Sequence, residues 1–321
     1  MGIATPTGVI LDGQVPTNGG MRTGNLILNG DMELVEFVTP LWKPSLFTTG
    51  VESTTAGAWS ALSASPYAGT YSLQAILTAL KTDKRAYAYQ DIPLNPGCQV
   101  DQLQLWHRCR FAQNLDANMA TYADIRVQFS LVDSTGALTT FSTWVPGDYA
   151  AWTVLTREFR PSDYLTAAQM LAAVSLRVTL NVWPVSDVAG PVSYVARFDN
   201  FTLEAEAAFA RNFSVGGTFP HRRDSAFERG TDQNRTLYQS SAGQGTAKRA
   251  GSIPFRLITE AQRDDLHGLW LYGARAPVTW YPVMSGYPDS ISVIFDPEWP
   301  FTPENADVGI LHRGTLGWQE Q

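Results

Sequence analysis

Side chains with hydrogen-bonding or aromatic groups recur at every second position in two segments of the chain. They are Gln104, Trp106, Arg108, Arg126 and Gln128. Apolar residues occupy the alternate positions, which is the period of a strand with one buried face. Aromatic rings stack on the apolar faces of sugars, and amide and guanidinium groups bind sugar hydroxyls. If the two strands are neighbours, these side chains form a glycan-binding face.

Four more aromatic residues are expected to rim this face: Trp42, Trp59, Tyr87 and Tyr89. The alternative is that many of the aromatic residues pack in the core. Trp106 would then be covered by the N-terminal segment or by another subunit.

A catalytic group of side chains is not recognisable. The four histidines are His107, His221, His267 and His312, and no two of them have the spacing of metal ligands. None of the common motifs for metal, nucleophile or nucleotide chemistry occurs. Asp296 and Glu298 flank a proline, but nothing fixes the distance between their carboxylates. His107 is expected in the core or at its rim, and we predict that the protein is not an enzyme.

Length, composition and charge limit the possible classes. The chain has 321 residues, of which 44% are hydrophobic and 17% charged. This is enough apolar material for a core, and the length predicts two domains. No apolar run approaches the roughly 18 residues that span a bilayer, and no signal peptide is recognisable. The net charge of −7 disfavours a nucleic-acid binder. We expect neither membrane insertion nor a nucleic-acid partner.

Charge is unevenly distributed along the C-terminal part of the chain. Residues 211–256 contain eight Lys or Arg against three Asp or Glu, whereas residues 260–321 contain three against nine. One interpretation is ordinary solvated surface. The other is a pair of complementary faces that meet between neighbouring copies of the chain. This candidate oligomer interface consists of Arg222, Arg223, Arg229, Arg235, Asp296 and Glu298.

The two cysteines, Cys98 and Cys109, are expected to be free thiols. Leu103, Leu105 and His107 alternate between them, which predicts one strand. Such a strand would hold the two residues roughly 35 Å apart, beyond the reach of a disulfide.

Short alternating segments separated by turns predict a β-rich module over residues 25–204. Residues 125–131 and 174–180 alternate strictly between apolar and other side chains, and a turn is predicted at residues 133–136. Many short strands at this spacing predict an antiparallel β-sandwich. Residues 164–173 predict a short helix inserted between strands, with Ser162 or Asp163 as its cap.

Six motifs of this module occur in the order found in a known family. The module opens with N-L-I-L-N-G-D-M-E at residues 25–33 and closes with F-D-N-F-T-L-E at residues 198–204. The other four lie at residues 68–75, 87–97, 103–108 and 152–159. Together they resemble the strands of carbohydrate-binding, galactose-binding-like jelly rolls. The resemblance implies a jelly roll closed by its first and last strands, with glycan as the ligand class.

The same resemblance implies a candidate metal site. Glu33 and Asp199 match acidic positions that help to hold a structural calcium ion in that family. Calcium takes about six or more oxygens, so backbone carbonyls near Ser72 would have to contribute. Asn200 replaces the second aspartate of the family pattern, which lowers the charge available to an ion. The alternative is that Glu33 and Asp199 only accept backbone hydrogen bonds.

Residues 218–321 predict a small α+β domain with one helix. A linker rich in Ala and Gly is expected at residues 205–217, and residues 1–24 are expected to be an extended arm. Thr259 and Gln262 form a capping box, and apolar residues at helical spacing predict a helix over residues 260–272. Strands are predicted at residues 253–258, 277–283, 290–295 and 308–311. This order resembles small domains of bacteriophage tail-tip and baseplate proteins.

The two resemblances imply a structural virion protein of a tailed bacteriophage, from the tail tip, baseplate or neck. The jelly roll would bind host glycan or decorate the particle, and the C-terminal domain would anchor it in an oligomer. Its partners would be other copies of itself, other virion proteins and a cell-surface glycan. It would be assembled in the host cytoplasm and located in the virion.

The alternative is a non-catalytic carbohydrate-binding protein of a polysaccharide-degrading system. A hydrolase would need two carboxylates roughly 5 to 10 Å apart beside a groove, and no such pair is marked.

Overall fold

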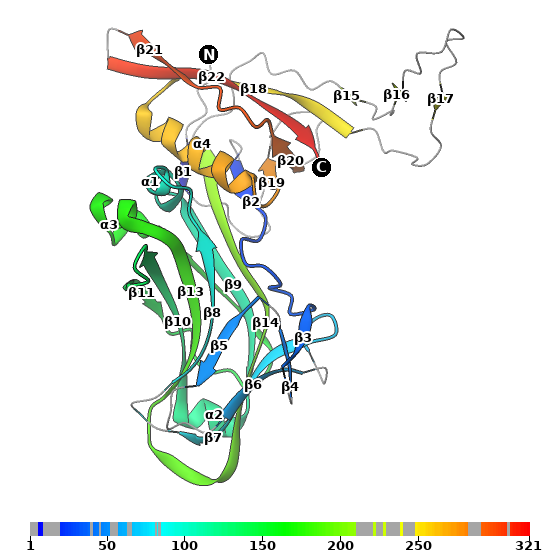
Figure 1. The fold of residues 1–321 in the computed structure, drawn as a ribbon, viewed down its shortest axis with the longest axis vertical. Helices are drawn as coiled ribbons and strands as arrows, with labels where there is room; N and C mark the ends of the chain where they lie inside the picture. Colours follow the sequence, from blue (N-terminus) through cyan, green and yellow to red (C-terminus); the bar gives the residue numbers. More distant parts are fainter. Residues whose placement is uncertain are drawn as a thin grey trace. The chain divides into compact units, whose positions relative to one another are not determined.

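The computed structural model consists of two compact units. One is Asn25–Glu206, called the sandwich here, and the other combines Met1–Gly24 with Ala207–Gln321 and is called the terminal unit (Figure 1). The described residues are 6–8, 20–38, 41–44, 46–51, 57–62, 66–80, 82, 85–209, 221–222, 227–228, 238–239, 248–281, 290–306 and 309–321.

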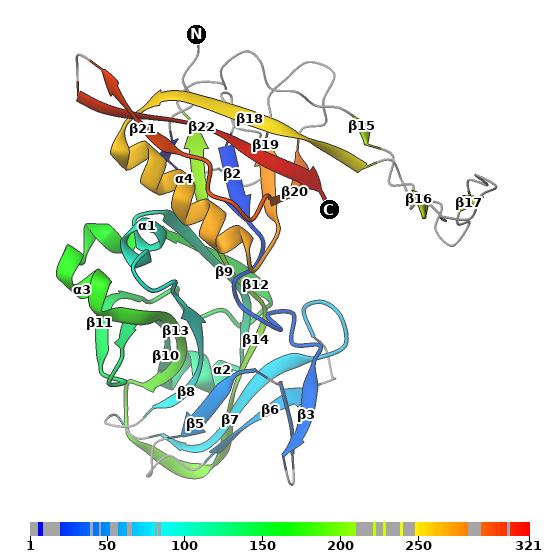
Figure 2. The same ribbon diagram turned by 45° about the horizontal axis from the view of Figure 1, so that its top comes forward.

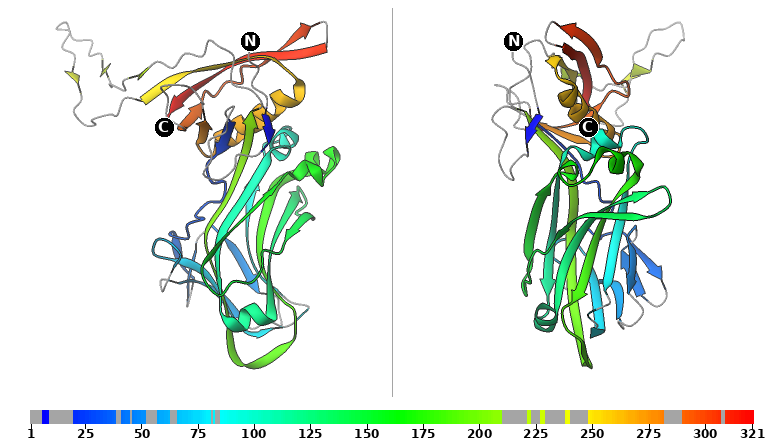
Figure 3. Two further views of the ribbon diagram at one scale, coloured as in Figure 1. Left: turned by 180° about the vertical axis from the view of Figure 1, so that it is seen from behind. Right: turned by 90° about the vertical axis from the view of Figure 1, so that its left-hand side faces the viewer.

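Two antiparallel sheets form the sandwich (Figure 3). The β14 sheet has the order β6 (Gly57–Leu62), β7 (Ser72–Leu80), β14 (Val188–Phe209), β9 (Trp106–Leu115) and β12 (Thr153–Phe159). The β13 sheet has the order β11 (Leu138–Trp144), β10 (Ala123–Asp133), β13 (Ala173–Pro184), β8 (Ala86–Pro93) and β5 (Thr48–Val51). A separate hairpin pairs β3 (Val35–Val38) with β4 (Leu41–Pro44). The predicted antiparallel β-sandwich is confirmed.

Aromatic side chains on the inner faces of the two sheets build the core. Ring centroids of Phe111 and Phe198 lie 6.1 Å apart, and those of Phe129 and Phe159 lie 4.0 Å apart. Burying each such ring stabilises the fold by about 1.5 to 3 kcal/mol. His107 stacks on Phe159 at 5.6 Å and is fully buried. Burial lowers the pKa of His107 to about 4, so the ring is neutral at pH 7. The prediction of a core histidine is confirmed.

Segments far apart in the sequence close the sandwich. The Leu26 N–H donates to the Leu203 carbonyl (2.8 Å), and the Phe201 N–H donates to the Gly30 carbonyl (2.7 Å). The Asn25 side chain bridges the same two segments, because its Oδ1 accepts from Leu203 N (2.9 Å) and its Nδ2 donates to the Phe201 carbonyl (3.0 Å). The predicted closure of one sandwich by these segments is confirmed.

The opening motif forms turns, however, and not the predicted first strand. Asn29 and Met32 have left-handed backbone conformations, with φ of 53° and 60°. The Asn29 side chain also accepts from Leu34 N (2.7 Å) and donates to the Leu34 carbonyl (2.8 Å). Asparagine tolerates this conformation and forms hydrogen bonds with nearby backbone. The N–H and carbonyl of Leu34 are therefore bonded to a side chain and not to a neighbouring strand.

We expect Gly30→Ala to destabilise the sandwich by about 2 to 4 kcal/mol. A Cβ at Gly30 would lie 1.9 Å from the Phe201 carbonyl oxygen and 2.7 Å from Asn25 Nδ2. The carbonyl is backbone in the closing segment, so it cannot move away without breaking the closure. Calorimetry of the full chain measures the change. Gly97→Ala is the comparison variant: a Cβ there meets nothing within 4 Å, so its loss of about 1 to 2 kcal/mol reports only the strain of its φ of +78°. Equal losses in both variants would contradict the steric explanation.

The predicted strand over residues 103–108 is confirmed only from Trp106 onward. Helix α1 covers Gln99–Leu103, and β9 begins only at Trp106. The Gln104 N–H donates to the Val100 carbonyl (2.9 Å), and Gln102 Oε1 accepts from Asn95 N (2.7 Å). These bonds hold the segment as a helical turn. The apolar alternation came from a helix end followed by a strand start. The two cysteines are nevertheless free thiols, as predicted.

The other short helices of the sandwich are α2 (Ala117–Tyr122), α3 (Ala167–Ala172) and the 3₁₀ helix Pro161–Asp163. Helix α3 lies within the predicted range of 164–173. Its cap is Thr166, which forms a capping box with Gln169, and not Ser162 or Asp163, which belong to the 3₁₀ helix.

In its described residues, the terminal unit is a sheet with one helix. Its sheet runs from the end of β14 through β2 (Gly20–Thr23), β19 (Val278–Tyr281), β20 (Ile291–Phe295), β22 (Gly309–Glu320), β18 (Lys248–Ile258) and β15 (His221–Arg222). β1 (Pro6–Gly8) pairs with the end of β14, and β21 (Thr302–Ala306) pairs with β22. β16 (Phe227–Glu228) pairs with β17 (Tyr238–Gln239).

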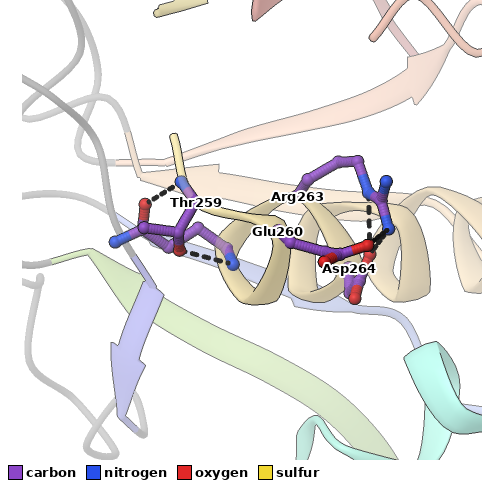
Figure 4. Close-up of polar contacts among 5 residues, drawn as sticks. Thr259, Glu260, Arg263 and Asp264 are labelled. Carbon is purple, nitrogen blue, oxygen red and sulfur yellow. Dashed lines mark hydrogen bonds and ion pairs between the residues drawn. The ribbon is translucent and has the colours of Figure 1, made fainter. Parts of the chain in front are cut away.

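Helix α4 (Glu260–Gly273) packs beside this sheet (Figure 2). It begins at the predicted capping box, in which Gln262 N donates to Thr259 Oγ1 (3.4 Å) and Thr259 N donates to Gln262 Oε1 (2.8 Å). Arg263 forms ion pairs with Glu260, one turn earlier, and with the next residue, Asp264 (Figure 4). Leu266 and Leu269 are buried, as the predicted apolar face requires.

Two predicted boundaries need correction. The end of the expected arm is β2, which pairs with β14 on one side and β19 on the other, with Met21 and Thr23 buried. It is therefore an inner strand of the sheet, because it forms hydrogen bonds with both β14 and β19. The first part of the expected linker is also strand, because β14 continues to Phe209. The rest of that linker, residues 210–217, lies outside the described residues.

Candidate functional site

The predicted glycan-binding residues do not share one face. β10 carries Arg126 and Gln128, and its neighbours are β11 and β13. β9 carries Trp106 and Arg108 and lies in the opposite sheet, between β12 and β14. The prediction that these two strands are neighbours is wrong. After β9 the chain passes through α2 and enters the other sheet as β10.

Of the three predicted residues on or next to β9, Arg108 is committed to a buried ion pair. The Arg108 side chain is 4% exposed, and its Nη2 and Nε donate to Glu158 Oε1 at 2.9 and 3.2 Å. The Gln104 carbonyl accepts from Arg160 Nε (2.7 Å). Trp106 is half-buried. Gln104, Trp106 and Arg108 therefore do not belong to the face that carries Arg126 and Gln128, and glycan binding at these three residues stays a prediction.

Arg126 and Gln128 instead belong to a polar and aromatic surface on the outer side of the β13 sheet, called the β13 face here. Of its members, all but Arg85, which directly precedes β8, alternate with inward-facing residues along three strands, and Thr179 and Asn181 are themselves buried. The members are Arg85, Tyr87, Tyr89, Asp91, Asp124, Arg126, Gln128, Arg177, Thr179, Asn181 and Trp183. The strand register aligns them in rows across the sheet, since Arg126 and Tyr87 are both opposite Asn181. Two of the expected rim residues, Tyr87 and Tyr89, are thus part of the surface itself.

Hydrogen bonds fix the polar centre of the β13 face. Gln128 Oε1 accepts from Arg85 Nη1 (2.9 Å) and from Asn181 Nδ2 (3.1 Å). Asn181 is fully buried, and its Oδ1 accepts no hydrogen bond from the described residues. Arg126 Nη2 donates to Asp124 (2.9 Å). Asn181 therefore acts from below the surface by holding the Gln128 side chain in place.

Tyrosine rings form the flat part of the β13 face. Tyr87 and Tyr89 stack on each other with centroids 6.2 Å apart and an angle of 29° between the rings. A Cβ at Gly50 of β5 would lie 2.4 Å from the Tyr87 hydroxyl, so glycine lets the ring lie across that strand. The Arg177 guanidinium lies 3.7 Å from the Tyr89 ring centroid, and Asp91 holds it with two bonds of 2.7 Å. Asp91 raises the pKa of Arg177 through these bonds.

Two further arginines contact the ring of Trp183. The guanidinium carbons of Arg126 and Arg85 lie 4.6 and 5.7 Å from its ring centroid. Cation–π contacts of this kind contribute about 0.5 to 2 kcal/mol each. The rings and guanidinium groups of the β13 face are therefore ordered before any ligand arrives.

Sequence reasoning missed the residues of β13. Val178 and Leu180 predict this strand, and the residues that alternate with them were a usable signal for its outer face. Of the two other expected rim residues, Trp59 is core, 2% exposed, with its Nε1 donating to the Gly50 carbonyl (3.1 Å). The side chain of Trp42 lies outside the described residues.

Glu33 and Asp199, the candidate calcium ligands, hold the segment 67–71. Asp199 Oδ2 accepts from Tyr67 N (2.9 Å) and Ala68 N (3.0 Å). Glu33 Oε1 accepts from Thr70 N (2.6 Å) and Tyr71 N (3.1 Å). We call this arrangement the carboxylate clasp.

The donor set of the clasp fits hydrogen bonding better than calcium. Asp199 Oδ1 accepts from Asn200 N (2.7 Å), so three of the four carboxylate oxygens already accept backbone N–H groups. Within the described ranges, no three His, Cys, Asp or Glu side chains gather as a metal site. Calcium at this position stays a prediction.

The candidate oligomer interface is only partly described. Asp296 and Glu298 follow β20 and are exposed. Arg222 lies on β15, but its side chain is outside the described part. Arg223, Arg229 and Arg235 lie wholly outside the described residues.

No helix in the described ranges is both long and apolar enough to cross a bilayer. No protein-family model matches the chain, and no curated protein matches it.

Solved structures similar to the chain include the family 16 carbohydrate-binding module-2, with 20% identity and a TM-score of 0.33 over 56% of this chain and 99% of that one. Tailspike protein 4 of bacteriophage CBA120 has 11% identity and a TM-score of 0.38 over 56% of this chain and 21% of that one. The family 11 module from Clostridium thermocellum, in complex with a mixed-linked tetrasaccharide, has 13% identity and a TM-score of 0.33 over 59% and 95%.

Proposed function

We propose that the protein binds a glycan chain on the β13 face and performs no chemistry on it. The observation that carries this proposal is the alignment of aromatic and polar side chains in rows across that face. Tyr87 and Tyr89 supply a stacked aromatic platform, and Gln128, which the buried Asn181 holds, adds an amide group to the same face. A sugar chain needs both, since its rings have apolar faces and its edges carry hydroxyls.

Pre-organisation favours binding on this face. The side chains are already held by the ion pair of Arg177 with Asp91 and by the bonds to Gln128. Fewer rotamers are lost when the ligand arrives, which raises affinity. The carboxylates of the face, Asp91 and Asp124, are engaged with arginines, which supports binding without acid–base catalysis.

The test is binding of the full chain to a panel of soluble polysaccharides by affinity electrophoresis, followed by calorimetry of those retained. We expect at least one polysaccharide to retard the protein. The polysaccharide should be chemically unchanged after prolonged incubation with the protein. Absence of retardation across the panel would refute binding, and shortening of the polymer would refute the non-catalytic part.

We further propose that the chain is a structural virion protein of a tailed bacteriophage, in which the terminal unit attaches the sandwich to the particle. Two features support this role. The order of elements in the terminal unit resembles tail-tip and baseplate domains in sequence, and Asp296 and Glu298 are exposed there. The alternative is the accessory protein of a polysaccharide-degrading system, which would remain a monomer.

Raising the salt concentration should dissociate the oligomer expected from this role. Rim charges such as Asp296 and Glu298 would face the basic residues of a neighbouring copy, and salt screens such pairs over about 8 to 10 Å. Native mass spectrometry and light scattering at low and at molar salt measure the change. An Asp296→Asn, Glu298→Gln variant should already be dissociated at low salt. A ring that resists both treatments would contradict the charge pairing, and a monomer under all conditions would favour the alternative.

A further inference from the structure

A small pocket lies on the β14 sheet, the sheet opposite the β13 face. It has a volume of about 140 Å³. The residues that line it come from three neighbouring strands and one loop: Tyr67, Arg110, Phe111, Ala112, Val154, Asn200 and Thr202. We call it the Tyr67 pocket. Ala112 is paired with Val154 on one side and with the residue before Asn200 on the other, so its short side chain leaves room between longer neighbours.

The backbone of the Tyr67 pocket is irregular at one point. β14 has a bulge between Asp199 and Thr202, and Asn200 within it has a φ of 49°. Asparagine is one of the few non-glycine residues that tolerate this conformation. Here the bond from Asn200 N to Asp199 Oδ1 enforces it. Bulges re-aim side chains beside binding sites, and this one places Asn200 in the pocket lining.

The carboxylate clasp holds the other wall. Asp199 Oδ2 accepts from the backbone of Tyr67 and Ala68, so one buried carboxylate positions both Asn200 and Tyr67. The Tyr67 side chain is 42% exposed, and its ring centroid lies 5.9 Å from that of Trp152. An exposed ring braced by a second ring is a stacking platform.

The chemistry of this pocket matches one sugar ring. Tyr67 offers an aromatic face, and Arg110, Asn200 and Thr202 offer a guanidinium, an amide and a hydroxyl. Pockets that take drug-sized ligands measure roughly 300 Å³ or more, so this volume suits a single ring better than a chain. We infer that the Tyr67 pocket binds a terminal monosaccharide unit, which would make the sandwich a two-site glycan binder.

The experiment measures binding of individual methyl glycosides to the full chain by saturation-transfer NMR and calorimetry. The probes are the methyl glycosides of glucose, galactose, mannose, N-acetylglucosamine and glucuronic acid. The last distinguishes an acidic sugar, which Arg110 would favour, from a neutral one. We expect one of these probes to bind, with affinity about tenfold weaker or worse in Tyr67→Ala. Tyr67→Phe should retain most of the affinity because the ring remains.

Asn200→Gly is the sharper variant, because glycine adopts the same backbone conformation without strain and only the amide is lost. It should melt no lower than the native chain and still lose affinity for the glycoside. The double variant Tyr87→Ala, Tyr89→Ala on the β13 face should leave glycoside binding unchanged. Failure of every probe to bind would overturn the inference. So would binding that survives both Tyr67→Ala and Asn200→Gly, or binding that is lost in the β13-face variant. Polysaccharide binding by the β13 face is measured separately, so either site can fail alone.

Discussion

Replacing Tyr87 and Tyr89 together by alanine should lower the affinity for a retained polysaccharide at least about a hundredfold. The two rings form one stacked platform on the outer side of β8. Each ring that stacks on a sugar removes apolar area from water, and loss of about 1.4 kcal/mol per ring is tenfold in affinity. Calorimetric titration of the full chain with the polysaccharide measures the effect.

Two control variants separate stacking from folding. Tyr87→Phe, Tyr89→Phe keeps both rings and should change affinity only a few-fold. Trp106→Ala removes a half-buried ring from β9 in the opposite sheet and should leave binding intact. If Trp106→Ala abolished binding while the tyrosine variant retained it, the ligand would lie on the β14 sheet and the proposed face would be wrong.

Asp199→Ala should destabilise the sandwich by about 3 to 5 kcal/mol. Its carboxylate is fully buried and accepts backbone N–H groups of Tyr67, Ala68 and Asn200. Removing it leaves these three donors without their acceptor. For a unit of this size the melting temperature should fall by about 6 to 20 °C. Differential scanning calorimetry of the full chain measures this drop.

Asp199→Asn and Glu33→Ala complete this experiment. Asparagine keeps one acceptor oxygen, so it should lose about half as much stability. Glu33 is more exposed than Asp199, and its alanine variant should be the mildest. A chelator added to the native chain tests calcium directly. If it lowered the melting temperature as far as Asp199→Ala does, an ion and not the backbone bonds would be the main stabiliser of the clasp.

The two carboxylates of the clasp respond to pH in opposite senses. N–H bonds from Thr70 and Tyr71 lower the pKa of Glu33 below its ordinary 4.5. Its contribution is therefore complete above that pH and is lost as the pH falls through the folded-state value. Burial raises the pKa of Asp199 above its ordinary 3.8, so protonation of Asp199 favours the folded state as the pH falls. In Asp199→Asn this compensation is absent, and stability should fall more steeply below pH 4.5 than in the native chain.

Much of the fold could be predicted from local sequence. The alternation in residues 125–131 and 174–180 predicted β10 and β13, and the capping box at Thr259 predicted the start of α4. These features depend on interactions within a few residues, so the sequence around them contains the information. The contact between the opening and closing motifs was also predicted correctly. The opening motif is a loop, however, because Asn29 and Met32 have left-handed backbone conformations.

The sequence by itself determined which residues face outward on each strand, because side chains alternate whatever the neighbours are. It did not determine which strands lie side by side. That depends on long-range packing of apolar faces, and β9 and β10, consecutive in the chain, are in opposite sheets. Only the tertiary structure therefore separated Trp106 and Arg108 from Gln128 and placed Asn181 and the two tyrosines beside it.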